Sequence, residues 1–228
     1  MTRWLASVQS VEEAQTLLMN LPDILDMKDP AQGALGALSV DEVSNIVDLV
    51  AGTCLTSATV GDLPMNADLI MQAIRDMADS GVNYVKVGLF PDCRLTECLS
   101  EMSTMIGQLN VPVIAVIFAD KMPGKDVIPL LKSSGFHGVM VDTASKNGRH
   151  LLDYWDELSL TEFVETAREH NLLCGLAGAL RFEDIALLQP IGADYLGFRS
   201  ALCQHQKRTS VLEPNLAEQI HKAIHFDG

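Results

Sequence analysis

The stretch "DSGVNYVKVGLF", residues 79–90, contains the signal that decides the fold. Gly81 follows an amphipathic segment, and a short valine-rich run begins almost directly after it. Glycine commonly ends helices, and apolar runs of this length and composition form strands. The same form recurs as "SSGFHG" (133–138) and "PIGADY" (190–195). The chain is therefore predicted to repeat a unit in which a helix ends and the next strand begins.

About eight strand-then-helix units fit into the 228 residues without a visible linker. The strands are expected at 4–8, 23–28, 54–60, 84–90, 112–119, 138–144, 174–180 and 195–202. The helices are expected at 10–20, 39–52, 67–81, 94–109, 125–135, 160–171, 181–192 and 213–225. This pattern predicts an α/β fold in which residues 1–228 form a single (β/α)8 TIM barrel. An open, doubly wound sheet is the alternative architecture.

The composition limits the classes of function. A hydrophobic content of 48% is ample for a core, and a formal charge of −14 argues against non-specific nucleic-acid binding. An anionic ligand would therefore need a local positive pocket, while the overall charge serves solubility. Five cysteines at scattered positions do not indicate a disulfide framework. We therefore expect a reduced, cytoplasmic protein, with apolar helix faces that leave room for a homo-oligomer.

No apolar run approaches the roughly 20 residues that a membrane-spanning helix needs. The N-terminal segment "MTRWLASVQSVEEAQ" reaches acidic residues too soon for a signal peptide. The expected strand ends lack clustered histidines, which disfavours a metal-dependent aldolase. We predict no membrane association, no metal ion and no organic cofactor.

Polar residues gather where the expected strands end. On a (β/α)8 barrel, active sites lie at the C-terminal ends of the strands and in the loops that follow. The candidate catalytic residues are Asp26, Lys28, Lys86, Asp142 and Lys146. The candidate substrate- or phosphate-binding residues are Thr59, Gly61, Asp62, Gly88, Gly178, Ala179, Arg199 and Ser200.

Side-chain alternation predicts which of these residues point into the barrel. Leu25 and Met27 share one face of their strand, so Asp26 and Lys28 share the other. By the same rule Lys86 lies opposite an apolar row of valines, and Asp142 lies opposite Val139 and Val141. Because the outer face of a barrel strand packs on helices, both lysines and both aspartates are expected to point inward.

Two lysines that point into the barrel indicate a catalytic role, because burying an ammonium group costs several kcal/mol unless other groups compensate its charge. The purely structural interpretation is that Lys28 forms an ion pair with Asp26 that plugs the barrel. The catalytic interpretation is that a desolvated lysine near another cation supplies a neutral amine, which attacks a carbonyl and forms a Schiff base. A second lysine or a carboxylate then transfers protons.

The expected ends of the last two strands, "GLAGAL" and "LGFRSAL", indicate phosphate binding. Barrels commonly bind phosphate there, through exposed backbone amides, and Arg199 would add positive charge. The alternative is that the small residues only permit close packing of strand on helix. Together with the lysines, these features predict an aldolase-like lyase that acts on phosphorylated aldehydes or ketones.

The chain contains the long motifs "DILDMKDPAQGALGA", "SATVGDLP", "YVKVGLF", "MVDTASKNGRHLLDYW", "LAGALRFEDI" and "LGFRSALC". From about the first expected strand to the last, the chain resembles the (5-formylfuran-3-yl)methyl phosphate synthase family. The resemblance implies a TIM barrel that condenses two glyceraldehyde 3-phosphate molecules into a furan aldehyde phosphate, with release of phosphate and water. The product would enter biosynthesis of methanofuran or of its counterpart in methylotrophic bacteria.

The resemblance also implies roles for particular residues. Lys28 would form the Schiff base, Lys86 would accept a proton, and Asp26, Asp142 and Lys146 match further polar positions. Within these motifs the sequence departs from the family pattern, because Ala34 and Ala179 stand where serine is usual and Ser200 stands where glycine is expected. Two other functions remain as alternatives: another Schiff-base barrel aldolase, and a catalytically silent phosphate-binding barrel.

Overall fold

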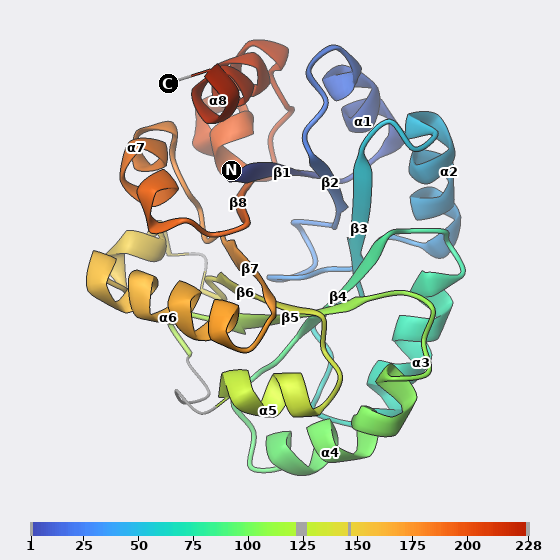
Figure 1. Cartoon of the computed structure of the whole chain (residues 1–228). Coiled ribbons are helices and arrows are strands. Elements are labelled where there is room, and N and C mark those ends of the chain that lie inside the picture. The colour runs from blue at the N-terminus through green and yellow to red at the C-terminus, as the bar shows by residue number, and fades with distance from the viewer. Residues whose placement is uncertain (1, 122–126, 146, 227–228) are drawn as a thin grey trace.

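Eight parallel strands form a closed barrel in which each strand pairs with the next along the chain. The register places Ser7 opposite Asp26 and Asp26 opposite Ser57, so these three residues share one level of the barrel. The first and last strands close the ring, with Leu5 opposite Gly197. The predicted (β/α)8 barrel is confirmed, with the helices arranged around the strands (Figure 1).

The computed structural model describes residues 2–121, 127–145 and 147–226. The strands are β1 (Arg3–Val8), β2 (Ile24–Met27), β3 (Leu55–Thr59), β4 (Tyr84–Gly88), β5 (Val113–Phe118), β6 (Gly138–Asp142), β7 (Leu173–Leu176) and β8 (Tyr195–Phe198). The α-helices are α1 (Val11–Leu17), α2 (Val40–Val50), α3 (Ala67–Ala78), α4 (Leu95–Ile106), α5 (Val127–Ser133), α6 (Glu157–Glu169), α7 (Ile185–Leu188) and α8 (Pro214–Phe226).

Short polar side chains cap the starts of several helices. The Ser39 side chain accepts a hydrogen bond from the backbone N–H of Glu42 at the start of α2, and Asn66 caps α3 in the same way. Asp156 caps α6, which begins at Glu157, three residues before the predicted start. Each cap satisfies a backbone donor that the first turn of a helix leaves without an intrahelical partner.

The predicted alternation of side chains is confirmed by two separate apolar layers. Leu25, Met27, Val85 and Val87 belong to the outer layer, between the barrel and the helices. The smaller, inner layer fills the barrel. Its buried members are Leu5, Ile24, Ala34, Leu35, Ile114, Val116, Phe118, Met140, Ala177 and Tyr195.

The last two strands and α7 are shorter than the sequence predicted. β7 ends at Leu176 and β8 at Phe198, so the predicted phosphate-binding residues beyond them lie in loops. A single α-helical turn, α7, is flanked by 3-10 turns in place of one continuous helix over 181–192. Pro190 lies in the second of these turns and has no backbone N–H to continue an α-helix.

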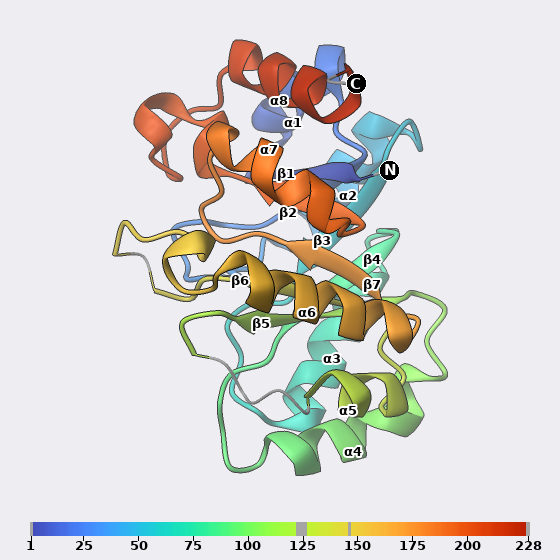
Figure 2. The same ribbon diagram turned by 60° about the vertical axis from the view of Figure 1, so that its left-hand side comes forward.

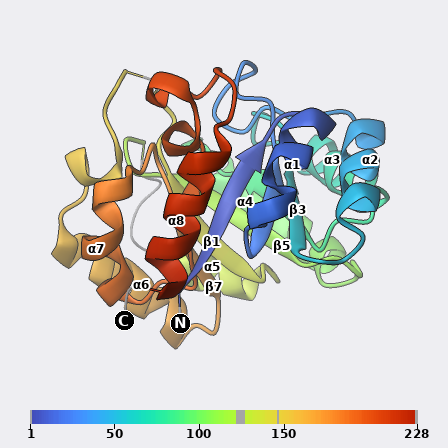
Figure 3. The ribbon, with the colours of Figure 1, turned by 90° about the horizontal axis from the view of Figure 1, so that it is seen from above.

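Helices from both ends of the chain cover the seam of the barrel. Figure 2 shows α6 on the outside of β7, and Figure 3 shows α8 in red beside β1 and α1 in blue.

Across the described residues, none of the helices combines the length and the apolar character needed to cross a membrane.

A substitution at Gly138, the first residue of β6, tests how tightly the barrel interior is packed. A Cβ atom at this position would lie 2.7 Å from the carbonyl oxygen of Leu173 and 2.8 Å from Cδ1 of Ile114. We expect Gly138→Ala to lower the free energy of unfolding by about 1–3 kcal/mol, because the backbone of β7 must move to make room. Urea unfolding of the two proteins measures the difference.

Gly107→Ala is the matched control, because a Cβ there would lie 3.6 Å from the carbonyl oxygen of Ser103, which is an ordinary van der Waals distance. Gly107 also has φ of −65°, which alanine adopts readily. We expect it to change stability by no more than about 0.5 kcal/mol. Equal unfolding midpoints for the two variants would contradict the packing described for β6.

Candidate active site

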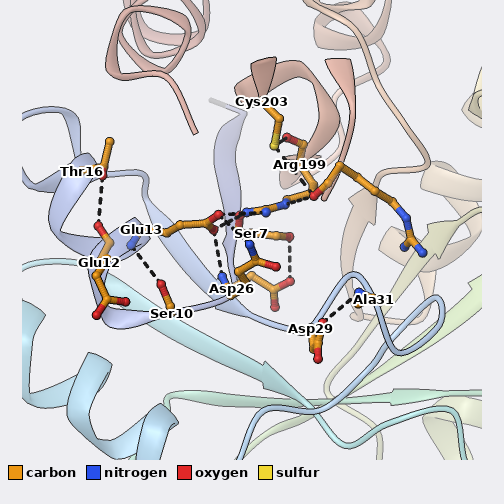
Figure 4. Close-up of polar contacts among 12 residues, drawn as sticks. Ser7, Ser10, Glu12, Glu13, Thr16, Asp26, Asp29, Ala31, Arg199 and Cys203 are labelled. Atoms are coloured by element: carbon orange, nitrogen blue, oxygen red, sulfur yellow. Dashed lines mark hydrogen bonds and ion pairs between the residues drawn. The ribbon is translucent and has the colours of Figure 1, made fainter. Parts of the chain in front are cut away.

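A fully buried carboxylate lies at the centre of the barrel. Asp26 of β2 forms an ion pair with Lys86 of β4, and 3.0 Å separates Oδ1 from Nζ. The Ser57 hydroxyl donates to Asp26 Oδ1 at 2.6 Å, and the Ser7 hydroxyl donates to Oδ2 at 3.0 Å. Figure 4 shows Ser7 beside Asp26. Both carboxylate oxygens therefore have partners, as a buried carboxylate requires.

Charge and burial shift both groups of this ion pair. Burial raises the pKa of Asp26, but the positive charges of Lys86 and Lys28 and the Ser57 hydrogen bond outweigh it, so the pKa lies below its usual value. Burial lowers the pKa of Lys86; Asp26 opposes the shift and Lys28 adds to it, so the net pKa is lower than usual. The amine of Lys86 is thus easier to deprotonate than that of an exposed lysine.

The second lysine lies at the floor of the open part of the site. Lys28 directly follows β2, its side chain is 11% exposed, and its Nζ lies 3.7 Å from Oδ2 of Asp142 on β6. Asp142 also accepts a hydrogen bond from the backbone N–H of Thr143 at 2.6 Å. The structure thus pairs Lys28 with Asp142 and Asp26 with Lys86. The Lys28–Asp26 plug considered from the sequence is wrong, because Lys86 and two hydroxyl groups occupy both oxygens of Asp26.

A cavity of about 420 Å³ opens above these residues at the C-terminal ends of the strands. This volume falls within the range of roughly 300–1,000 Å³ that is typical of small-molecule sites. Among the described residues that line it, seven are lysine or arginine and one, Asp142, is acidic. The basic ones are Lys28, Lys86, Arg149, Arg181, Arg199, Lys207 and Arg208. A chain with a net charge of −14 therefore presents a locally positive cavity, as expected for an anionic ligand.

An apolar plug closes the β4–β5 side of the barrel mouth. The rings of Phe90 and Phe118 stack with centroids 4.7 Å apart, and Leu35 packs into the same inner layer. A Cβ at Gly88 would lie 2.8 Å from Leu35 Cδ1 and 3.1 Å from Phe90. Gly88, predicted to contact substrate, instead allows this plug to pack and lies outside the lining of the cavity.

Three further predicted binding residues support the loop after β2. The Thr59 hydroxyl donates to the Gly36 carbonyl at 3.0 Å, and Asp62 accepts the backbone N–H groups of Ala34 and Leu35 at 2.9 Å each. Gly61 has φ of +96°, a conformation that favours glycine in the turn after β3. Thr59, Gly61 and Asp62 lie outside the cavity lining and hold the loop that follows Lys28.

The loops after β7 and β8 do face the cavity, as predicted. Gly178 and Ala179 are consecutive residues with positive φ, +111° and +51°, and both line the cavity with Ser200. A Cβ at Gly178 would lie 2.9 Å from Thr143, so the close approach of two loops requires glycine here. Successive backbone N–H groups in such a turn form a concave site that suits an anion.

The Arg199 guanidinium, predicted to bind phosphate, makes hydrogen bonds to oxygens of the protein. It forms a buried ion pair with Glu13 of α1, donates to the Ser7 carbonyl at 3.0 Å, and donates through Nε to the Arg208 carbonyl at 2.7 Å. Figure 4 shows Arg199 reaching toward Glu13. Because Arg199 also lines the cavity, phosphate binding by this residue stays a prediction.

One predicted residue cannot be placed, and several residues that line the cavity, among them Ser7 and His150, were not among the predicted site residues. Lys146 lies outside the described residues. Ser7 shares the inward face of β1 with Leu5, so alternation could have found it. His150 lines the cavity with Nδ1 3.2 Å from Asp184 Oδ2, but it follows β6 in a loop, where no periodic pattern signals its position.

The family model described as 4-HFC-P synthase matches residues 4–221. The chain is 33% identical to the (5-formylfuran-3-yl)methyl phosphate synthase of Methanococcus aeolicus, over 96% of this chain and 97% of that protein. It is 38% identical to a putative enzyme of the same name from Methylorubrum extorquens, over 97% of this chain and 91% of that one. The chain belongs to the 4-HFC-P synthase family.

Solved structures share the fold of this family member at low sequence identity. The 3-hexulose-6-phosphate synthase of Salmonella typhimurium has a TM-score of 0.63 at 16% identity and covers 98% of each chain. The phosphoribosyl anthranilate isomerase of Thermotoga maritima has a TM-score of 0.69 at 13% identity, again with 98% coverage of each chain. The match to the 4-HFC-P synthase family spans all eight strands, and thus every element that supplies the cavity.

The Asp26–Lys86 pair makes the stability of this 4-HFC-P synthase family member depend on pH. The pKa of Asp26 is lower in the folded protein, so its ionised form stabilises the fold above roughly pH 3.9, the value of a free aspartate. That contribution is lost as pH falls through the folded pKa. We expect Asp26→Asn to lower the free energy of unfolding at pH 7 by about 3–5 kcal/mol, because Lys86 then lacks its partner. Urea unfolding at several pH values measures the difference.

The difference in the free energy of unfolding should begin to shrink below roughly pH 4, where the unfolded chain takes up a proton, and should be lost once pH falls below the lowered pKa of native Asp26. Asp26→Asn combined with Lys86→Met is the control, since removing the buried amine as well should recover part of the stability. If the two proteins differed in free energy of unfolding by the same amount at every pH from 3 to 7, the result would contradict an ionised Asp26–Lys86 pair.

Proposed function

We propose that this protein condenses two molecules of glyceraldehyde 3-phosphate into (5-formylfuran-3-yl)methyl phosphate, with loss of one phosphate and water. Membership of the 4-HFC-P synthase family supports this product. The observation that carries the mechanism is the placement of two lysine amines, Lys28 and Lys86, in the lining of one positively charged cavity. Carbonyl chemistry on a phosphorylated triose needs both an amine and positive charge near the phosphates.

Lys28 is the proposed Schiff-base residue. Its side chain is 11% exposed, so a carbonyl carbon can approach Nζ from the cavity. The neutral amine adds to the carbonyl of one triose phosphate, and loss of water gives an iminium ion that withdraws electrons from the adjacent carbon. Asp142, 3.7 Å from Nζ, is placed to stabilise the positive charge of the iminium.

Lys86 is the proposed proton acceptor. Burial lowers its pKa, which favours the neutral amine that a base requires, and the side chain reaches the floor of the same cavity. Removal of a proton from the carbon next to the iminium gives an enamine, which attacks the aldehyde of the second triose phosphate. Asp26 holds the Lys86 amine in position and stabilises its protonated form.

Later steps complete the furan ring. Attack of a hydroxyl group on the iminium carbon closes the ring, and departure of the Lys28 amine breaks the bond to the enzyme. Loss of water and of one phosphate then makes the ring aromatic, which drives the sequence forward. The basic lining and the Gly178–Ala179 turn are the proposed contacts for the phosphate groups. In class, the enzyme is a carbon–oxygen lyase, and its product would supply the furan of methanofuran or of a bacterial counterpart.

Borohydride trapping tests the role of Lys28. When the protein is incubated with glyceraldehyde 3-phosphate and reduced, we expect a triose-derived mass on Lys28 in peptide mass spectra. Lys28→Ala should lose this adduct and lower kcat on the order of 10³-fold or more, because the proposed nucleophile is removed. The absorbance of a furan aldehyde reports product formation.

Lys121→Ala is the matched control, because Lys121 also follows a barrel strand but is exposed and lies outside the cavity lining. We expect it to keep normal activity and the adduct on Lys28. Normal furan formation with an unmodified Lys28 would overturn the Schiff-base assignment. An acyclic aldol product would overturn the furan synthase function and favour another Schiff-base aldolase.

A further inference from the structure

The loop between β8 and α8 carries a cation across the mouth of the barrel. Arg208 lies in this loop, is partly buried and lines the cavity. Its Nη1 donates to the carbonyl oxygen of Gly33 at 3.0 Å, and Gly33 belongs to the loop after β2. The side chain therefore connects the last loop of the barrel to the loop that begins with Lys28.

The ion pair between Arg199 and Glu13 holds the backbone of Arg208 in place. Arg199 Nε donates to the Arg208 carbonyl at 2.7 Å, while the rest of its guanidinium bonds to Glu13 and Ser7. Glu13 also accepts the backbone N–H and the side-chain amide of Gln9, each at 3.0 Å. A buried carboxylate with this many donors is fully satisfied and rigid, so it defines the position of Arg199.

The donor groups of the two arginines are used differently. A guanidinium has five N–H donors in a planar fork. Arg199 directs its fork at protein oxygens of α1, β1 and the β8 loop. Within the residues that the structure describes, the Arg208 guanidinium makes one hydrogen bond to the protein, to Gly33. Most of its donors therefore remain for a ligand in the cavity that it lines.

We propose that Arg208 binds the phosphate group of the substrate and that the Glu13–Arg199 pair is the positioning support that holds it there. This inference rests on the proposed function, which supplies a phosphorylated triose as the ligand. A phosphate monoester matches the fork of an arginine and accepts two parallel hydrogen bonds from it. The backbone turn at Gly178 and Ala179 lines the same cavity and offers further donors.

The hydrogen bond from Arg208 to Gly33 links phosphate binding to the loop that follows Lys28. Because Arg208 holds both the phosphate and the loop after β2, phosphate binding stabilises the loop conformation that follows Lys28. Asp62 holds the same loop from the other side through Ala34 and Leu35. A phosphorylated aldehyde should therefore react with Lys28 faster than the same aldehyde without its phosphate.

Arg208→Gln tests the phosphate contact. The probe is glycerol 3-phosphate, which has no carbonyl and cannot form a Schiff base, and its binding is measured by calorimetry. We expect its Kd to rise 10-fold or more in the variant, and Arg208→Lys to give an intermediate value because lysine keeps the charge but not the fork. Lys222→Gln, on the exposed face of α8, removes the same charge far from the cavity and should leave the Kd unchanged.

A second measurement separates phosphate binding from a purely structural role. Borohydride trapping on Lys28 should slow in Arg208→Gln when glyceraldehyde 3-phosphate is the substrate, yet stay at the native rate with glyceraldehyde. A Kd equal to that of the native protein, or equal slowing with both aldehydes, would overturn the assignment of Arg208.

The positioning role of Glu13 is tested by a double-mutant cycle. We expect Glu13→Gln to raise the KM for glyceraldehyde 3-phosphate more than it lowers kcat, and to have little further effect once Arg208 is already glutamine. Glu13→Asp should restore part of the affinity. Independent, additive effects of the two substitutions on Kd would overturn the support by Glu13. If Glu13→Gln fails to fold, the same cycle is measured with Glu13→Asp.

These measurements also distinguish the two proposals. Furan formation by the native protein with phosphate binding that does not depend on Arg208 would overturn only the inference about Arg208. Phosphate binding that depends on Arg208 without any furan product would overturn only the proposed function.

Discussion

The ion pair between Asp26 and Lys86 is the interaction on which the arrangement of the site depends. An ammonium and a carboxylate at the centre of a barrel each lose several kcal/mol of hydration, which their mutual attraction offsets only with good geometry and further hydrogen bonds. Ser7 and Ser57, from the strands on either side of β2, supply those bonds at 3.0 and 2.6 Å. Closing the barrel brings these four side chains together, and the closed barrel in turn excludes the water that would weaken them. The consequence for chemistry is a lysine whose pKa lies below its usual value, beside a second lysine that faces the cavity.

The mouth of the barrel is divided into an apolar half and a charged half. Leu35, Phe90 and Phe118 fill the side above β4 and β5, so the cavity is confined to the side formed by the loops after β6, β7, β8 and β2. This division explains why some predicted binding residues contact ligand space and others do not. Gly178 and Ala179 face the cavity, whereas Gly88 lies under the plug. It also concentrates positive charge on one side of an acidic protein, where a phosphorylated substrate would enter.

Much of the site was predictable because barrel strands obey a period of two. That rule alone identified Asp26, Lys86 and Asp142 as inward residues, and the inner and outer apolar layers confirm it. The rule says nothing about the loops that follow the strands. It therefore missed His150 and could not foresee the ion pair between Arg199 and Glu13. Loop conformation depends on hydrogen bonds between segments far apart in sequence, such as the bond that joins Arg208 to Gly33.

The sequence by itself determined the order of strands and helices, the residues that face the barrel interior and, through its long motifs, the family. These properties follow from local periodicity and from residue identity, which need no knowledge of distant contacts. Only the tertiary structure decided the pairing of charges: Lys86 with Asp26, Lys28 with Asp142, and Arg199 with Glu13. Alternation places a side chain on a face but not opposite a particular partner, because partners are set by the register between strands and by the path of loops. The electrostatics of the cavity is therefore a property of the closed barrel.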